Sequence, residues 1–167
     1  MYFKTERLIA RRLELKDLNE FDEMQSNIRV MKYTLGRENT RVENANELEK
    51  IINEYALSET NRTIMGISKS SDETCSLVGA CAVIKRDVEC FEVGYRLLEK
   101  YWGNGFGLEI LEGLITYCLT DLGATELIAE VDKENIYSVR ILEKSSMNFV
   151  KEYYEENNLV RMYMLNR

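Results

Sequence analysis

The glycine-rich stretch Tyr101-Trp102-Gly103-Asn104-Gly105-Phe106-Gly107 carries the most information about the fold. It separates an apolar, strand-like run at 89–98 from a run with helical apolar spacing at 108–122. Alternating glycines let a backbone approach a ligand closely, and the start of a helix carries partial positive charge. The stretch therefore predicts a turn that binds phosphate oxygens. A flexible turn without a ligand is the alternative interpretation.

The spacing of these glycines differs from that of two other phosphate-binding loops. The stretch lacks the GxxxxGK[ST] pattern of P-loop nucleotide hydrolases, and it contains GxGxG instead of GxGxxG. No strand, glycine loop and helix follow one another near the N-terminus, which disfavours a dinucleotide-binding fold.

Strand and helix patterns alternate on both sides of this stretch. We expect strands at 6–13, 62–69, 75–84, 89–98, 126–131, 149–153 and 159–165, and helices at 15–28, 44–56, 108–122 and 135–146. Asn44 and Glu47 resemble a capping box for the second helix. Asn157 and Asn158 suit a left-handed turn in the last hairpin. The order predicts one α/β domain, with a mixed sheet and helices on both faces.

Composition excludes several kinds of chemistry. The 167 residues carry 22 Lys and Arg against 29 Asp and Glu, a net charge of −7, and there is no histidine. Ser-His-Asp and Cys-His catalysis and histidine metal sites are therefore excluded. The four cysteines have no CxxC spacing, so we expect buried thiols in a reducing compartment and no metal site.

The same composition bears on partners and location. The acidic balance disfavours nucleic acid as a partner. No apolar run reaches the ~20 residues of a membrane helix, and residues 1–12 do not resemble a signal peptide. We expect a soluble, cytoplasmic protein without a membrane partner, as a monomer or a homodimer.

Four segments, in order, resemble one known family. They are TERLIARRLELKDL at 5–18, EVGYRLLEKYWGNGFGLE at 92–109, NIYSVRILEKSSM at 135–147 and the final hairpin. The chain resembles the GNAT superfamily of acetyl-CoA-dependent N-acetyltransferases, and is most similar to its RimJ/RimL-type branch, which includes ribosomal-protein N-terminal acetyltransferases. The resemblance implies a single GNAT-type domain over residues 1–167. It also implies a mixed sheet of about seven strands, in which strands 4 and 5 splay apart to admit acetyl-CoA.

The resemblance further implies which residues bind coenzyme A. The backbone of the glycine loop would bind the pyrophosphate, with Gly105 and Gly107 at the two small-residue positions of the family and Trp102 at its Gln/Arg position. The end of the preceding strand would pair with the pantetheine arm, and Asn135 would contact the coenzyme while capping a helix. The expected binding residues are Tyr95, Arg96, Leu97, Trp102, Gly103, Asn104, Gly105, Phe106, Gly107 and Asn135.

Transfer to an amine requires a base, because a protonated amine is not a nucleophile. Glu92 is the leading candidate, since strand alternation places it on the face opposite Phe91 and Val93. An ordinary solvated strand glutamate is the alternative interpretation, and Glu89 is a weaker candidate for the base.

The leaving thiolate needs a proton donor, and Leu142 stands about where many members of the superfamily have a tyrosine. The RimJ/RimL-type branch often has a serine in this helix, which Ser138 matches, while Tyr137 is a neighbouring alternative.

These residues predict direct acetyl transfer to a primary amine in a ternary complex. The acceptor would be a protein N-terminus or a small amine. One alternative is a sensor that binds acetyl-CoA without transferring the acetyl group, and a weaker one is a protein that binds another nucleotide. Tyr153, Tyr154 and Tyr163 could line an acceptor pocket, although core or sheet positions fit their spacing better. The basic segment 29–41 reads as a solvated loop.

Overall fold

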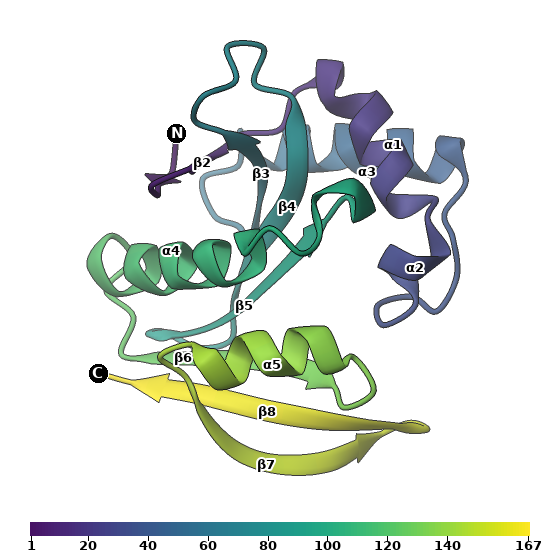
Figure 1. Ribbon diagram of the computed structural model, residues 1–167. Helices are drawn as coiled ribbons and strands as arrows, with labels where there is room; N and C mark the ends of the chain where they lie inside the picture. Colours follow the sequence, from purple (N-terminus) through teal and green to yellow (C-terminus); the bar gives the residue numbers. More distant parts are fainter.

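Eight strands form one mixed sheet in the computed structural model, which describes residues 1–167 (Figure 1). The strand order across the sheet is β1-β2-β3-β4-β5-β6-β8-β7, and every neighbouring pair is antiparallel except β5 and β6. The strands are β1 (Phe3–Lys4), β2 (Leu8–Arg11), β3 (Arg62–Lys69), β4 (Leu77–Lys85), β5 (Cys90–Leu97), β6 (Glu126–Asp132), β7 (Asn148–Glu155) and β8 (Asn158–Asn166).

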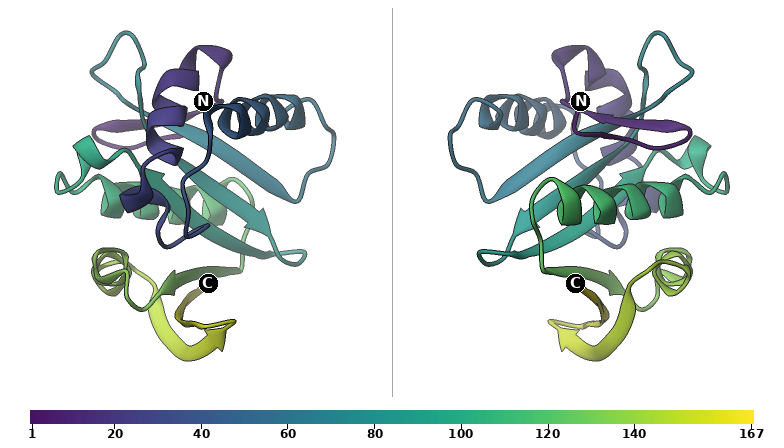
Figure 2. Two further views of the ribbon diagram at one scale, coloured as in Figure 1. Left: turned by 90° about the vertical axis from the view of Figure 1, so that its right-hand side faces the viewer. Right: turned by 90° about the vertical axis from the view of Figure 1, so that its left-hand side faces the viewer.

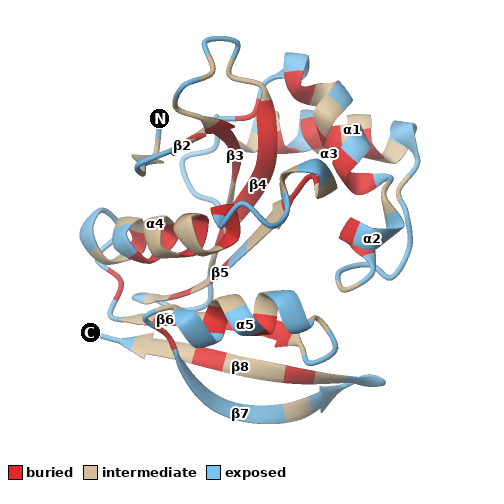
Figure 3. Ribbon diagram, viewed as in Figure 1, coloured by how far each residue is buried: buried red, intermediate tan, exposed pale blue.

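The predicted mixed sheet is confirmed, with eight strands where about seven were expected. The short β1, which pairs with β2, lies outside the strands read from the sequence. Two residues are too few for an alternating pattern to be recognised. At the opposite edge, β7 is largely exposed, as Figure 3 shows.

The helices cover both faces of the sheet (Figure 2). One face carries the 3₁₀ turn η1 (Leu15–Asp17) and the helices α1 (Leu18–Gln25), α2 (Ile28–Met31) and α3 (Arg41–Glu54), which pack on a core that includes Phe21 and Leu48. The other face carries α4 (Phe106–Thr120) and α5 (Ile136–Lys144), whose apolar residues join the larger core. Because helices cover both faces, β4 is apolar on both sides, as its sequence predicts.

The pairing of β5 with β6 is short. Their ladder joins Cys90 to Glu126, Phe91 to Leu127 and Glu92 to Ile128, and goes no further. Beyond Glu92 the two strands diverge, as Figure 1 shows. The expected splay between the two central strands is confirmed, and it opens the sheet at its middle.

Three local expectations were wrong. The capping box of α3 is formed by Thr40 and Glu43, whose backbone and side-chain groups bond reciprocally, whereas Asn44 is buried. In the β7–β8 turn, Glu156 takes the left-handed conformation instead of an asparagine. The basic segment 29–41 includes most of α2 and the first residue of α3, so it is not a simple loop.

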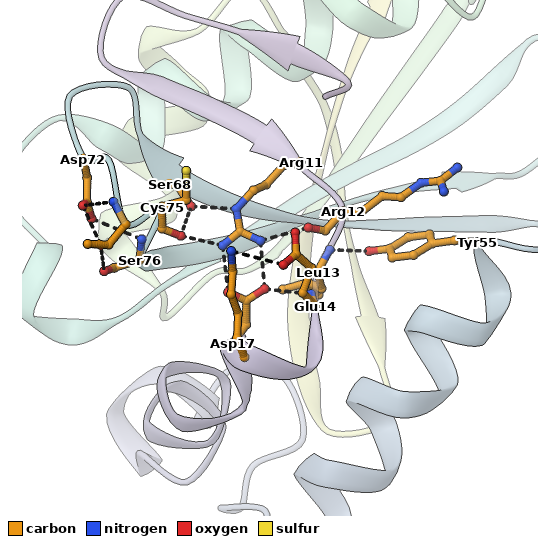
Figure 4. Close-up of polar contacts among 12 residues, drawn as sticks. Arg11, Arg12, Leu13, Glu14, Asp17, Tyr55, Ser68, Asp72, Cys75 and Ser76 are labelled. Carbon is orange, nitrogen blue, oxygen red and sulfur yellow. Dashed lines mark hydrogen bonds and ion pairs between the residues drawn. The ribbon is translucent and has the colours of Figure 1, made fainter.

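Arg11 holds the first half of the fold together (Figure 4). Its guanidinium donates five hydrogen bonds, two of them to the carboxylate of Asp17 at 2.7 and 2.8 Å. The other acceptors are the hydroxyl of Ser68 and the carbonyl oxygens of Arg12 and Cys75. The hydrogen bond to Asp17 raises the pKa of Arg11. The pair fixes β2 to η1, to β3 and to the loop before β4.

The cysteines form no disulfide. Cys81 and Cys118 are buried, while Cys75 and Cys90 are partly exposed. Burial raises the pKa of Cys118 to about 12. No helix is both long enough and apolar enough to cross a bilayer.

We expect Asp17→Asn to destabilise the protein by about 3 kcal/mol, because it leaves the buried Arg11 without its counter-charge. The side chains of Arg11 and Asp17 are only 12% and 3% exposed. Urea denaturation of Asp17→Asn measures the loss of unfolding free energy. Glu23→Gln is the control, since Glu23 pairs with Lys100 at the surface and its loss should change stability by less than ~1 kcal/mol. Equal effects of the two substitutions would contradict a structural role for the Arg11–Asp17 pair.

Candidate functional site

A cavity of about 410 Å³ lies where β5 and β6 separate. Side chains from α1, α3, β3, β4, β5, β6 and α5 line it. Five residues expected from the sequence reach it: Glu92, Tyr95, Arg96, Asn135 and Ser138. The structure therefore brings together residues that lie up to 46 positions apart in the sequence (138 − 92).

Glu92 stands at the last paired position of β5. Phe91 and Val93 are buried in the core beneath α4, whereas Glu92 lines the cavity with its side chain 19% exposed. Its Oε2 accepts hydrogen bonds from Nε of Arg86, at 2.6 Å, and from Nη2 of the same residue. Its Oε1 has no protein donor, which leaves one carboxylate oxygen available to a ligand.

Glu89, the weaker candidate for the base, lies outside the cavity. Its side chain is exposed, and its carbonyl oxygen accepts hydrogen bonds from the N–H groups of Thr125 and Glu126. The geometry favours Glu92 over Glu89.

The glycine-rich stretch forms a turn with unused backbone donors. Gly103 and Gly105 have φ angles of 76° and 78°, which favour glycine. The N–H groups of residues 103–108 donate to no acceptor in the protein, and Glu109 is the first residue of α4 to make a helical bond, to Gly105. Six consecutive N–H groups are therefore free at the positive end of a fifteen-residue helix.

The side chains of this turn support its backbone. The indole of Trp102 donates to the carbonyl oxygen of Leu97 at 3.0 Å, and the amide of Asn104 donates to two carbonyl oxygens of the turn at 3.1 Å. Phe106 is buried. These side chains hold the turn against β5 and leave the backbone donors to meet a ligand.

Two cations beside the turn were not anticipated from the sequence. Arg7 donates to the carbonyl oxygen of Asn104 at 3.0 Å and lies over the ring of Phe106. The ammonium of Lys69 lies 4.9 Å from the ring centre of Tyr101 and forms no ion pair. Both residues are distant from the turn in sequence, so no local pattern could link them to it. Lys69 adds positive charge to a turn already suited to anions, whereas the charge of Arg7 is balanced by its ion pair with Glu109 at 2.7 Å.

The start of α5 forms another wall of the cavity. Asn135 caps the helix, and its Oδ1 accepts from the N–H of Ser138 at 3.3 Å. The capping role of Asn135 is thus confirmed, while its contact with the coenzyme stays a prediction. Ser138 is partly buried and lines the cavity, but Tyr137 is 71% exposed and does not.

Tyr95 lies against this wall from β5. Its buried hydroxyl has no hydrogen-bond partner, and a Cβ added at Gly107 would lie 3.2 Å from that oxygen. Burial raises the pKa of Tyr95 to about 12, and Ser138 acts in the opposite direction. A protonated hydroxyl is therefore held in the cavity at neutral pH.

The three C-terminal tyrosines do not line the cavity. Tyr163 is buried in the core, and Tyr154 is exposed on the edge strand. The hydroxyl of Tyr153 donates to Glu130 at 2.6 Å, and this bond, together with burial, raises the pKa of Tyr153. All three tyrosines therefore lie in the core or on the sheet, as their spacing in the sequence favoured.

The cavity therefore combines a carboxylate with a free oxygen, two hydroxyls and, beside it, a turn suited to anions. The groups that could take up or release a proton lie near the end of the β5–β6 ladder. This arrangement is suited to moving a group from a phosphate-bearing donor to a nucleophile that must lose a proton.

Comparison with known proteins gives a matching family. Residues 7–148 match the family model described as "Acetyltransferase (GNAT) domain". The chain is 33% identical over 150 residues to an uncharacterized N-acetyltransferase, p20, from Bacillus licheniformis, an alignment that covers 89% of this chain and 82% of the relative.

Solved structures share the fold. An acetyltransferase of the GNAT family from Bacillus anthracis has a TM-score of 0.86 at 23% identity, covering 99% of this chain and 98% of the other. Spermidine N-acetyltransferase from Vibrio cholerae, solved in complex with CoA and spermine, has a TM-score of 0.79 at 19% identity, with 95% of each chain covered.

Proposed function

The chain belongs to the GNAT acetyltransferase family, and on that basis we propose that it is an acetyl-CoA-dependent N-acetyltransferase acting on a primary amine. The finer assignment to the RimJ/RimL-type branch is part of this proposal. Its support is the match of the segments at 92–109 and 135–147, which carry the glycine turn and the start of α5.

One observation carries the proposal: six free N–H groups stand beside a sheet that opens at a carboxylate. The donors of residues 103–108 would bind the pyrophosphate of the coenzyme. Nothing lies within 4 Å of a Cβ added at Gly103, so the turn is open to a ligand. Lys69 would add positive charge opposite the phosphates, whereas Arg7 is paired with Glu109 and holds the turn through Asn104.

The opening between the strands suits the rest of the coenzyme. Residues 93–97 of β5 have no strand partner on the side of β6, so the backbone groups of the alternate residues 93, 95 and 97, which point away from β4, face the opening. The carbonyl oxygen of Leu97 is already bound by Trp102, and the backbone of Arg96 faces its partner Ala80 in β4, which leaves Tyr95 as the main pairing position. When bound, acetyl-CoA supplies an acetyl group activated as a thioester.

Glu92 is the proposed base. An alkyl ammonium has a pKa near ~10 and an α-ammonium one near ~8, so at neutral pH the acceptor arrives protonated. The free Oε1 of Glu92 can take that proton directly or through one water. Holding the amine and the acetyl donor in one cavity supplies a further part of the rate.

Ser138 is the proposed donor to the leaving thiolate. Thiols have a pKa near ~8.5, so a weak acid suffices. Ser138 lines the cavity at the first turn of α5, where its N–H is fixed by Asn135. Tyr95 is the second candidate, because its buried hydroxyl lacks a partner.

A sensor that binds the coenzyme without transfer remains the competing function. The free oxygen of Glu92 favours the enzyme, because a sensor has no need of a base in the cavity. Both a protein N-terminus and a small amine are acceptors within this proposal. Soluble cytoplasmic location and the absence of nucleic-acid partners stay predictions from the composition.

We expect Gly105→Ala to weaken binding of coenzyme A by about tenfold, the equivalent of one hydrogen bond to a charged group. The φ angle of 78° is unfavourable for alanine, so the turn would rearrange and misalign its donors. Titration calorimetry with coenzyme A measures the effect. Gly123→Ala is the matched control, since Gly123 has a φ of 68°, open surroundings and a place at the far end of α4. Equal affinity losses in both variants would contradict the assignment of the turn.

We expect Glu92→Gln to lower kcat by about 100-fold or more, because the amide cannot accept the proton. Thiol release from acetyl-CoA, measured with N-terminal peptides, polyamines, aminoglycosides and amino acids, gives kcat. Coenzyme binding should be unchanged, and Arg86→Gln is the control that removes the partner but keeps the carboxylate. Coenzyme binding without thiol release from any amine would favour the sensor.

We expect Ser138→Ala to lower kcat by about tenfold. This is less than general acid catalysis usually contributes, because a thiolate is weakly basic and can leave without a proton. Tyr95→Phe should leave kcat within about twofold. The pH–rate profile of the wild type should rise as the acceptor loses its proton. It should have no descending limb at pH 10, because a serine hydroxyl does not ionise there and the pKa of Tyr95 is about 12. The reverse order of the two variants would assign the proton donation to Tyr95.

A further inference from the structure

Arg96 is a cation in the cavity with almost no partners. It lies on β5, and its only hydrogen bond is from Nη1 to Oε1 of Gln25, at 2.6 Å. It forms no ion pair with any carboxylate. Burial lowers the pKa of Arg96, although the guanidinium stays charged at neutral pH. Arg96 is only partly buried, and its free N–H groups are open to the cavity. Charged side chains that are drawn in from the surface are normally paired, so this arrangement needs an explanation.

Arg11 shows what a structural arginine looks like in this chain. It donates five hydrogen bonds, and Asp17 balances its charge (Figure 4). Arg96 uses one donor, and the remaining N–H groups have no protein acceptor. Both residues are on strands and are covered by the same layer of helices, so packing alone does not account for the difference. The free donors of Arg96 line the cavity.

Gln25 provides a second free donor at the same place. It ends α1, is 5% exposed, and lines the cavity beside Arg96. While its Oε1 accepts from Arg96, its buried Nε2 has no acceptor. A buried amide donor without an acceptor lowers stability, and an anion in the cavity would accept its hydrogen bond.

The nearby acids do not neutralise Arg96. Glu47 is the carboxylate that acts on its charge, but Glu47 lies 3.1 Å from Arg62, which also binds Glu54 at 2.9 Å. Glu92 pairs with Arg86 at the other end of the cavity. Glu130 and Asp132 also line the cavity, but Glu130 accepts a hydrogen bond from Tyr153, Asp132 accepts one from the N–H of Glu134, and neither pairs with Arg96. Arg96 is therefore a cation without a carboxylate partner in a cavity that also holds acids.

The location of Arg96 separates it from the turn expected to bind phosphate. Successive strand residues face opposite sides of a sheet. Tyr95 faces α4 and packs against Gly107 at its start, so Arg96 faces α1 instead. Phe21, Met24, Ile51 and Ile64 form the apolar wall beside it. An anion at Arg96 would belong to the acceptor and not to the coenzyme.

We propose that Arg96 and Gln25 bind a carboxylate of the acceptor, so that the substrate is a primary amine that also carries a carboxylate. This inference rests on the proposed N-acetyltransferase activity. The amine would be directed to Glu92 while the carboxylate meets Arg96, four residues along the same strand face and ~13 Å away between Cα atoms. Long side chains at both ends shorten that span. A free amino acid and a peptide with an acidic residue near its N-terminus share this chemistry.

The test compares acceptors that differ only in the carboxylate. Leucine, leucinamide and 3-methylbutylamine form one series, and aspartyl-leucinamide with asparaginyl-leucinamide forms the peptide arm. O-phosphoethanolamine tests phosphate in place of carboxylate. We expect the wild type to favour leucine or aspartyl-leucinamide over their uncharged partners in kcat/KM, corrected for the fraction of unprotonated amine. If leucine is the better acceptor, the carboxylate is that of a free amino acid; if aspartyl-leucinamide is better, it is that of a side chain in a peptide.

Arg96→Gln should raise KM for the acid acceptors by about 10- to 100-fold and leave the uncharged amines within about twofold. Gln25→Glu keeps Arg96 but gives it an internal carboxylate partner, so it should show the same selective loss even if Arg96→Gln folds poorly. Arg12→Gln, which removes an exposed arginine outside the cavity, is the charge control. Coenzyme A affinity should be equal in all four proteins.

Calorimetric titration of the acid acceptors into the protein with coenzyme A provides a readout that does not depend on turnover. Loss of this binding in Arg96→Gln and Gln25→Glu supports the carboxylate site even if no thiol is released, an outcome in which the proposed activity alone would fail. Equal turnover of acids and uncharged amines by the wild type would overturn the inference. A preference for O-phosphoethanolamine, or weaker binding of coenzyme A by Arg96→Gln, would overturn it as well.

Discussion

The pairing between β5 and β6 ends after three residues, and the site depends on that early end. A continuous parallel ladder would satisfy the backbone groups of residues 93–97 that point away from β4, and it would close the sheet. Because the ladder stops at Glu92 and Ile128, a backbone edge and a cavity open in the middle of the sheet. The surrounding structure holds this opening from both sides. Antiparallel β4 anchors β5 over its whole length, and β8 does the same for β6. The helices α4 and α5 begin beside the opening, so their N-terminal groups meet it.

Polar groups are well hydrogen-bonded where Arg11 holds the first strands together, but many around the cavity have no partner. Arg11 is saturated with acceptors and holds β2, β3 and η1 in one arrangement. Around the cavity, by contrast, donors and acceptors are left over: the N–H groups of residues 103–108, one oxygen of Glu92, the hydroxyl of Tyr95, the amide of Gln25 and most of the guanidinium of Arg96. Two other buried polar atoms, Oδ1 of Asn44 and the hydroxyl of Tyr163, also lack partners and lie outside the cavity. Unsatisfied polar groups lower stability, so a group of them around one cavity is a mark of a site built for ligands.

Long periodic segments were predictable because their burial follows a simple rule. The apolar stripe of α4 and the continuous apolar run of β4 gave both elements within a few residues. Short or context-dependent features were not predictable. The two-residue β1 is defined only by its partner β2, and the capping box of α3 lies four residues before the expected one because Asn44 is buried against Asp22. In the last hairpin, Glu156 adopts the left-handed conformation although two asparagines follow it. Local preference was overruled by packing and register at each of these positions.

The sequence by itself determined the order of the longer strands and helices, the glycine turn, the absence of histidine chemistry, and the family to which the chain belongs, but not β1 or α2. These properties depend on residue types and on their spacing over short stretches of sequence, so the sequence alone predicts them. Only the tertiary structure decided that Glu92 keeps a free oxygen, that Tyr95 and Ser138 share a cavity wall, and that Arg7 and Lys69 lie beside the turn. It also decided that Arg96, expected to contribute only its backbone, turns a nearly unpaired guanidinium toward the acceptor side. Whether a side chain is paired depends on neighbours that the fold brings from distant parts of the chain, and no local pattern records them.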